Sequence, residues 1–185
     1  SITVDSATSV TLEIRVNAST DDVEEKSDGT TDLTSSDLEL IQASSLQTVG
    51  IRFNGLTIPP GATILSAYIQ FQADEAHSGL TELTIHGEAI DNAPTFISED
   101  GNVTSRVKTT ASGPWTPAPW GTVGEAGPDQ RTPDLALVLQ EIVDRPGWAS
   151  GNSLVIIISG SGTRTAESYN GDQAAAPLLQ IEYLP

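Results

Sequence analysis

The chain of 185 residues carries a formal net charge of -17, from 25 acidic and 8 basic residues, and it contains no cysteine. A chain of this length fits one domain with its own hydrophobic core, which cannot be held by disulfides. The acidic excess disfavours nucleic acid and anionic lipid, because both bind clusters of Lys and Arg. The apolar run at 154–158 is far shorter than the roughly 20 residues of a membrane-spanning helix, so we expect no membrane insertion.

Alternation of apolar and polar residues with period two begins at residues 10–16 and predicts a half-buried strand. The same pattern, bounded by Gly, Pro, Asn or Asp, predicts strands at 37–41, 49–53, 67–73 and 83–89. Residues 154–159 are apolar on both faces, as in a central strand, and 178–183 alternate again at the end of the chain. A loop rich in Gly and Ser is expected between these last two strands.

One segment carries a helical period, in the apolar residues Leu135, Val138, Leu139, Ile142 and Val143. Thr132 suits the N-cap and Pro133 the first helical position, while Pro146 and Gly147 stop the helix. Many short strands, one helix and no βαβ alternation predict an all-β antiparallel β-sandwich of the jelly-roll type with one short α-helix. We expect a single domain over residues 1–185, with 1–9 as the remnant of a linker.

Acidic residues crowd the segment that follows the first predicted strand. Asp21, Asp22, Glu24 and Glu25 lie within five residues, and Asp28, Asp32, Asp37 and Glu39 follow. Calcium binds six to eight oxygen ligands, so such a loop is a natural site for it. Asp172, just before the last strand, approaches the same edge in a jelly roll. The alternative is that these carboxylates only solvate a surface, which is the interpretation we favour for a second group at Asp74, Glu75, Glu88 and Asp91.

Two tryptophans, Trp115 and Trp120, lie among prolines in the least regular part of the chain, residues 93–129. Rigid exposed indoles stack on the apolar faces of sugars at a small cost in conformational entropy. Basic residues nearby in sequence, such as Arg131, add charged hydrogen bonds to an acidic sugar. The alternative is that both indoles cover the edge of the core, as we also expect for Trp148.

Arg164, Glu167 and Tyr169 follow a glycine-rich turn and are expected to line one end of the sandwich, with a surface ion pair between Arg164 and Glu167 as the alternative. The two histidines, His77 and His86, have neither a metal-ligand spacing nor a nucleophile signature beside them. We therefore expect no enzyme, and keep an acidic glycoside hydrolase only as a minor alternative.

The segments 47–53 and 58–71, which include the turn Ile-Pro-Pro-Gly-Ala-Thr-Ile, carry a family resemblance. Together with 132–148, 151–158 and 176–183, they make the chain similar to the disaggregatase-related repeat (DNRLRE-like) domains of secreted bacterial proteins. These are jelly-roll sandwiches related to carbohydrate-binding modules, and the resemblance covers most of residues 10–185. The loop at 92–130 departs from the family pattern.

The resemblance implies polysaccharide recognition, and a calcium ion that maps onto Asp21, Asp22, Glu24 and Asp172. We therefore expect a non-catalytic, calcium-stabilised carbohydrate-binding accessory module of a secreted or cell-surface protein. Its expected partners are extracellular polysaccharide and covalently linked neighbouring domains, and its ligand-binding residues are Trp115, Trp120, Arg164 and Tyr169. The alternative is a structural or adhesive spacer without a glycan ligand, which burial of all the tryptophans would favour.

Overall fold

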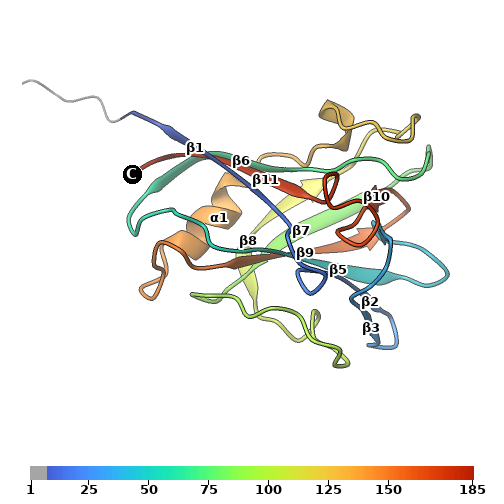
Figure 1. Ribbon diagram of the computed structural model, residues 1–185, viewed down its shortest axis with the longest axis horizontal. Helices are drawn as coiled ribbons and strands as arrows, with labels where there is room; N and C mark the ends of the chain where they lie inside the picture. The colour runs from blue at the N-terminus through green and yellow to red at the C-terminus, as the bar shows by residue number, and fades with distance from the viewer. Residues whose placement is uncertain (1–7) are drawn as a thin grey trace, which may run out of the picture.

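The computed structural model describes residues 8–185, so the expected linker at 1–9 lies almost entirely outside the described residues. Two antiparallel sheets pack face to face (Figure 1). The large sheet has the order β3 (Thr31–Asp32), β2 (Asp22–Lys26), β5 (Gln47–Phe53), β9 (Leu154–Ser161), β7 (Glu82–Glu88) and β8 (Lys108–Trp115). The small sheet has the order β1 (Val10–Arg15), β11 (Leu178–Leu184) and β6 (Thr63–Gln70). The predicted all-β antiparallel sandwich is confirmed.

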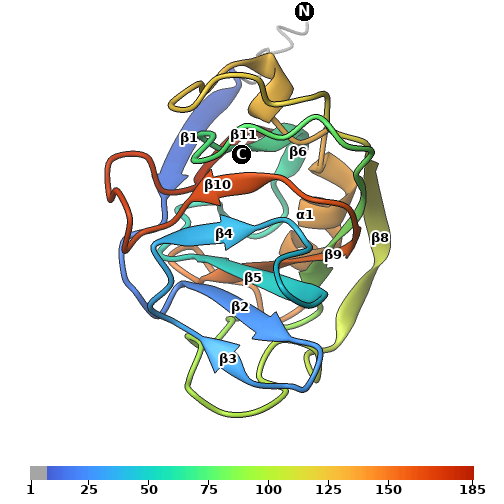
Figure 2. The same ribbon diagram turned by 90° about the vertical axis from the view of Figure 1, so that its right-hand side faces the viewer.

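A separate antiparallel pair is formed by β4 (Asp37–Glu39) and β10 (Thr165–Glu167). Figure 2 shows this pair between the two sheets, at the end of the sandwich that faces the viewer. The helices are a short 3-10 turn, η1 (Pro128–Gln130), and the α-helix α1 (Ala136–Val143). The β4–β10 pair thus closes one end of the molecule, where loops from both sheets meet it.

The core explains why the first five residues of β9, 154–158, are all apolar. Leu154, Ile156 and Ile158 face the main core between the sheets, while Val155 and Ile157 join a second cluster on the outer side of the large sheet. Phe96, from the loop between β7 and β8, covers that outer side. A Cβ on Gly50 in β5 would lie 2.6 Å from the Phe96 ring, so only glycine lets the loop pack this closely.

The helix α1 begins at Ala136, later than the predicted N-cap at Thr132. Thr132 and Asp134 instead accept hydrogen bonds from backbone N–H groups of the neighbouring strand β6. The Thr132 hydroxyl accepts the backbone N–H of Ile69 at 3.0 Å, and the Asp134 carboxylate accepts that of Ala67 at 2.9 Å. The sequence favoured a cap because Ser, Thr and Asp bind free backbone N–H groups wherever these occur, at an exposed strand edge as well as at a helix end.

The helix itself closes the gap between the two sheets. The Gln140 side chain accepts the N–H of Ile64 in β6 at 2.7 Å. On the other side, the Glu141 carboxylate accepts the N–H groups of Thr110 and Ala111 in β8 at 2.8 and 2.7 Å. One edge of each sheet is therefore covered by side chains from α1 or the segment leading to it.

Four strands were not predicted: the two-residue edge strand β3, and β2, β8 and β10. Strand β8 lies in the segment 93–129 that we expected to be irregular, and it tolerates Pro114 because it is the outermost strand of the large sheet. Strand β2 is missed because carboxylates occupy both of its faces, at Glu24 and Glu25, so no apolar alternation is visible. Strand β10 lies where a loop was expected.

Candidate functional site

Four carboxylates converge at the end of the sandwich that β4 and β10 close. Asp37 lies on β4, Glu167 on β10, and Asp74 and Glu75 follow β6. Carboxylate oxygens of Asp37, Asp74 and Glu75 all lie within 4.8 Å of one another. In the register of the pair, Asp37 is directly opposite Glu167. We call these four residues the acidic rim.

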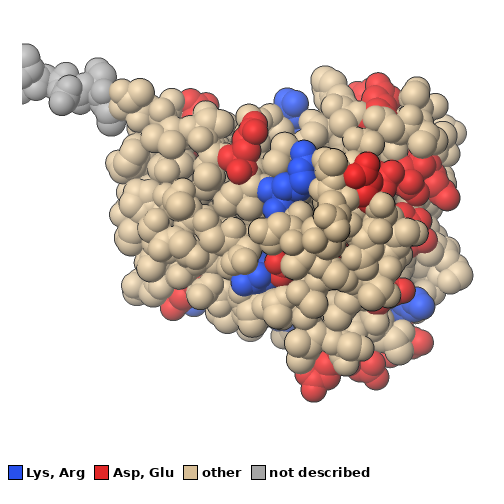
Figure 3. Space-filling view, viewed as in Figure 1, with Lys and Arg blue, Asp and Glu red and all other residues tan. Residues whose placement is uncertain are grey.

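The backbone brings the rim together because residues 72–75 run along the free side of β10. The carbonyl of Thr165 accepts the N–H of Asp74 at 2.9 Å, and Glu167 donates its own N–H to the carbonyl of Gln72 at 3.0 Å. These bonds fix the positions from which the side chains leave the chain. Figure 3 shows acidic side chains crowded at the right-hand end of the molecule, where β10 lies in Figure 1.

The carboxylates of the rim repel one another, and burial together with this repulsion raises the pKa of two of them. Burial, and then the neighbouring Asp74, raise the pKa of Glu167 from 4.5 to about 7. Burial also raises the pKa of Asp37, helped by Glu39, Asp74 and Glu75. Among the described residues, the one basic side chain bonded to the rim is His77, whose Nε2 lies 3.1 Å from Glu75 Oε2. The rim is thus an anionic site with little protein charge to balance it.

A second pair of carboxyl groups lies next to the rim. Glu24 Oε1 accepts the backbone N–H of Glu39 at 2.6 Å, and the amide of Gln47 donates to both glutamates at 3.3 and 2.9 Å. Burial, and then a hydrogen bond with Glu39, raise the pKa of Glu24 to about 9. Glu24 is therefore protonated at neutral pH in the ion-free protein.

The four residues predicted to bind metal have different surroundings. Asp22 Oδ2 accepts the backbone N–H of Tyr169 at 2.7 Å, and burial raises its pKa to about 6. Asp21 forms an ion pair with Arg52 at 2.9 Å, so its charge is already balanced. Asp172 is exposed and lies near enough to Glu167 to contribute to its raised pKa. The carboxylates close enough to share an ion are instead Asp37, Asp74 and Glu75.

The sequence signals for the acidic rim were present but assigned to separate groups. Asp37 belonged to the first acidic run, whereas Asp74 and Glu75 belonged to the second, which we interpreted as a solvated surface. The contact between them depends on how residues 72–75 pair with β10. No local pattern in the sequence encodes that pairing.

The predicted aromatic platform is not found, because the structure places its two tryptophans in the core. Trp115 is 7% exposed and Trp120 is 0% exposed. The Trp115 ring stacks on Phe71 with centroids 5.9 Å apart, and the Trp120 indole N–H donates to the carbonyl of Asp129 at 2.8 Å. Trp148 is buried as expected, so neither Trp115 nor Trp120 offers a flat face to a sugar.

Arg164 is also buried, and it holds loops together rather than facing a ligand. Its guanidinium donates to the backbone carbonyls of Pro117, Ala118, Gly79 and Thr163 and to the hydroxyl of Thr81. No ion pair with Glu167 is found among residues 8–185. Tyr169 is half-buried beside Asp22, so it is the predicted ligand-binding residue that remains partly at the surface.

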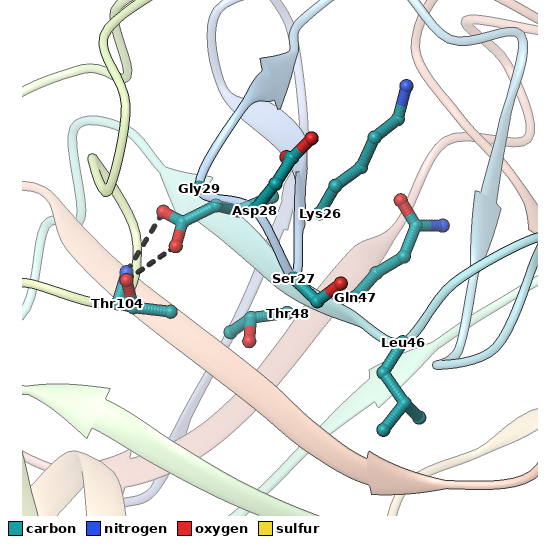
Figure 4. Close-up of a pocket in the computed structure, with 9 residues that line it drawn as sticks. Lys26, Ser27, Asp28, Gly29, Leu46, Gln47, Thr48 and Thr104 are labelled. Atoms are coloured by element: carbon teal, nitrogen blue, oxygen red, sulfur yellow. Dashed lines mark hydrogen bonds between the residues drawn. The ribbon is translucent and has the colours of Figure 1, made fainter.

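A cavity of about 370 Å³ lies on another part of the surface, lined by Glu25, Lys26, Ser27, Asp28, Gly29, Leu46, Gln47, Thr48 and Thr104. Figure 4 shows the two hydrogen bonds that Thr104 donates, through its backbone N–H and its hydroxyl, to the Glu25 carboxylate. Glu25 also accepts the N–H of Val103 at 2.6 Å, so both of its oxygens are engaged. The lining has no aromatic side chain.

Comparison with models of known protein families finds no match for this chain, and a search of curated proteins finds none either. Within residues 8–185, no helix is long and apolar enough to cross a membrane.

Proposed function

We propose that this chain is a non-catalytic, polysaccharide-binding accessory module of a secreted or cell-surface protein, stabilised by calcium at the acidic rim. The observation that carries the proposal is the convergence of Asp37, Asp74 and Glu75 within 4.8 Å, with Glu167 opposite Asp37. Like charges placed this close destabilise the fold unless a cation neutralises them. The choice of a polysaccharide as the ligand rests on the resemblance to secreted carbohydrate-binding sandwiches.

Calcium fits the rim because it is a hard cation that takes oxygen ligands at flexible geometry. The three carboxylates that lie within 4.8 Å of one another offer oxygen ligands. His77 beside Glu75 is the one imidazole bonded to the rim among the described residues, so the ligand set favours a hard cation over softer transition metals. Asp37 and Asp74 are half-buried and Glu75 is exposed, which leaves one side of the rim open to solvent. Water or sugar hydroxyl groups would complete the coordination on that side.

The surface beside the rim is a candidate contact for the polysaccharide. Tyr169 is anchored there by its backbone bond to Asp22, and a half-buried tyrosine ring offers both an apolar face and a hydroxyl group. This contact is smaller than the two-tryptophan platform expected from sequence. We therefore propose modest affinity for a single sugar, with useful binding arising from contacts to several units of a polymer.

A structural spacer is the second candidate function, and one observation favours it. All three tryptophans are buried, at 7%, 0% and 3% exposure for Trp115, Trp120 and Trp148. In this case the calcium ion would stiffen the end of the sandwich, and neighbouring domains in the parent chain would carry the activity.

A hydrolase fits the rim less well than a binding module. Glycoside hydrolases place two carboxyl groups on either side of one scissile bond, with about 5–10 Å between them. Three of the four rim carboxylates instead have oxygens within 4.8 Å of one another, as ligands of one ion do. Release of reducing sugars by the purified module would contradict the non-catalytic proposal.

Affinity electrophoresis through gels that contain neutral or acidic polysaccharides tests the proposal, with and without a calcium chelator. We expect the protein to be retarded by at least one polysaccharide, and a chelator to weaken the retardation. A calcium-dependent rise in melting temperature without retardation by any polysaccharide would favour the spacer. A protein indifferent to both calcium and polysaccharide would contradict both candidates.

A further inference from the structure

The outward face of the small sheet carries two rows of polar side chains across its strands. In the register of β1, β11 and β6, one row consists of Glu13, Gln180 and Tyr68, and the next of Arg15, Leu178 and Gln70. The residues between these rows, such as Leu179 and Ile69, are buried in the main core. The polar rows therefore point away from the core, and we call them the small-sheet face.

Arg131 extends the second row by one step. It forms an isolated antiparallel bridge with Gln70, and its Nε donates to the Gln70 side-chain oxygen at 3.2 Å. Its guanidinium carbon lies 4.1 Å from the centre of the Tyr68 ring. The stacking and the hydrogen bond together hold the guanidinium in one orientation. In the described part of the chain, its two terminal nitrogens make no hydrogen bond and remain available to a ligand.

Positive charge is scarce elsewhere in this chain, which has 8 basic residues and a net charge of -17. Arg52, Arg106 and Arg145 are in ion pairs with carboxylates. By contrast, Arg15 and Arg131 form no ion pair within residues 8–185, although Arg15 donates one hydrogen bond to the carbonyl of Ala176. Figure 3 shows basic side chains near the middle of the visible face, with some acidic side chains beside them and more at the acidic end.

The row Arg15, Leu178, Gln70 and Arg131 has the dimensions of an extended ligand. Neighbouring strands are about 4.8 Å apart, so three steps place the two arginine backbones about 14 Å from each other. Half-buried Leu178 lies between them and offers an apolar contact. A small anion would meet one guanidinium only, whereas a polymer with repeated anionic groups would meet both.

We propose that the small-sheet face binds an anionic polysaccharide, with Arg131 and Arg15 pairing with carboxylate or sulfate groups on separate sugar units. This inference rests on the proposed function and adds to it a second contact surface and the chemical class of the ligand. The Arg131 fork is the main contact, because a planar guanidinium pairs with such groups through two parallel hydrogen bonds.

The test is a titration of short soluble oligosaccharides against the calcium-loaded protein: an oligouronate for the carboxylate, a sulfated oligogalactan for the sulfate, and a neutral oligoglucan. We compare wild type with Arg131→Gln, Arg15→Gln and Arg131→Lys. Lys108→Gln is the matched control, because it removes one positive charge from an exposed position on β8. Melting curves establish that each variant is folded.

We expect one or both anionic oligosaccharides to bind, with Kd raised about tenfold by Arg131→Gln and by a smaller factor by Arg15→Gln. Arg131→Lys should restore only part of the affinity, since an ammonium lacks the planar fork. Equal losses in Arg131→Gln and Lys108→Gln would overturn the inference, as would binding of the neutral sugar alone with no effect of Arg131→Gln. Binding of the neutral sugar alone would leave the proposed function intact. Failure to bind any saccharide would overturn both the proposed function and this inference.

Discussion

Asp37 lies directly opposite Glu167 across the antiparallel β4–β10 pair. Like charges in that relationship normally weaken a strand pair. The pair nevertheless closes one end of the sandwich, and the adjacent pair of Leu38 and Ala166, both buried, holds it in place. The module thus builds an unfavourable electrostatic contact into a well-packed element, which is the arrangement expected where a cation is part of the folded state.

Calcium should stabilise the protein in proportion to its binding. A ligand that binds only the folded state adds about 3 kcal/mol to the free energy of unfolding at a hundredfold excess over its Kd. We expect millimolar calcium to raise the melting temperature, and Glu167→Gln to remove most of the rise. Glu99→Gln, an exposed acid outside the rim, is the control and should leave the rise unchanged. A melting curve unaffected by exhaustive chelation would contradict the proposal that calcium stabilises the protein.

The Glu167→Gln variant should also be more stable than wild type when no calcium is present. Burial, and then repulsion by Asp74, raise the pKa of Glu167 to about 7, so the substitution removes a charge that the fold disfavours. The variant therefore gains stability in chelator and loses the response to calcium. A lower melting temperature than wild type in chelator would show that Glu167 stabilises the fold without an ion.

The calcium-free protein should become less stable as the pH rises from acidic to alkaline values. The pKa of Glu24 is raised from 4.5 to about 9, and that of Glu167 from 4.5 to about 7, so the folded state holds these protons more tightly than the unfolded state. The free energy of unfolding therefore falls as pH rises from about 4.5 through 7 and towards 9. We expect a higher melting temperature near pH 5 than near pH 8 in chelator.

Calcium should reverse this trend, because it binds the deprotonated carboxylates. The rise in melting temperature caused by calcium should be larger at pH 8 than at pH 5. Thermal scans at both pH values, with and without calcium, measure all four states. A calcium effect of equal size at both pH values would mean that the ion does not compete with the protons of the rim.

Glu25 should anchor the loop between β7 and β8 to the large sheet. Its carboxylate accepts the N–H groups of Val103 and Thr104 and the Thr104 hydroxyl. Hydrogen bonds to a charged group contribute about 2 kcal/mol each, so Glu25→Ala should lower the free energy of unfolding by at least that amount. Thr104→Val removes one bond and should cost less. Amide exchange should accelerate at Val103, and an unchanged rate there would contradict the anchoring role.

The three tryptophans should report on packing and not on ligands. Because Trp115, Trp120 and Trp148 are at most 7% exposed, their fluorescence should resist quenching by iodide. Addition of a bound polysaccharide should leave the emission spectrum unchanged. Trp120→Ala should destabilise the fold by about 3–5 kcal/mol, the usual cost of removing a large buried aromatic. A strong shift of the emission spectrum on saccharide binding would indicate that at least one tryptophan lies at the ligand site after all.

The sandwich was predictable because its strands alternate apolar and polar residues, as β1 and β11 do. Strand β2 was not, since Glu24 and Glu25 are both buried on opposite faces and each needs partners from a distant segment. The tryptophans illustrate a different limit. Proline-rich neighbours are equally compatible with an exposed platform and with a buried edge strand, and the choice depends on whether the core has room for the rings.

Of the four residues of the acidic rim, the sequence placed only Asp37 in a candidate ion-binding group. An ion site at Asp37 follows from acidic crowding, but its partners Asp74 and Glu75 come from the end of β6. The bonds that place them run to Thr165 in β10, about ninety residues further along the chain. Pairings of that range are set by the packing of the whole fold.

Because α1 covers β6 and β8, two copies of this protein cannot associate by pairing strands at those two edges. The two sheets have four outer strands, and on two of them side chains such as Gln140 and Glu141 already occupy backbone donors. A neighbouring molecule therefore cannot lengthen the sandwich by adding a strand there. The outer strands that α1 leaves uncovered in the described part of the chain are β1 and β3, so a strand added by another copy would have to pair at one of those two edges.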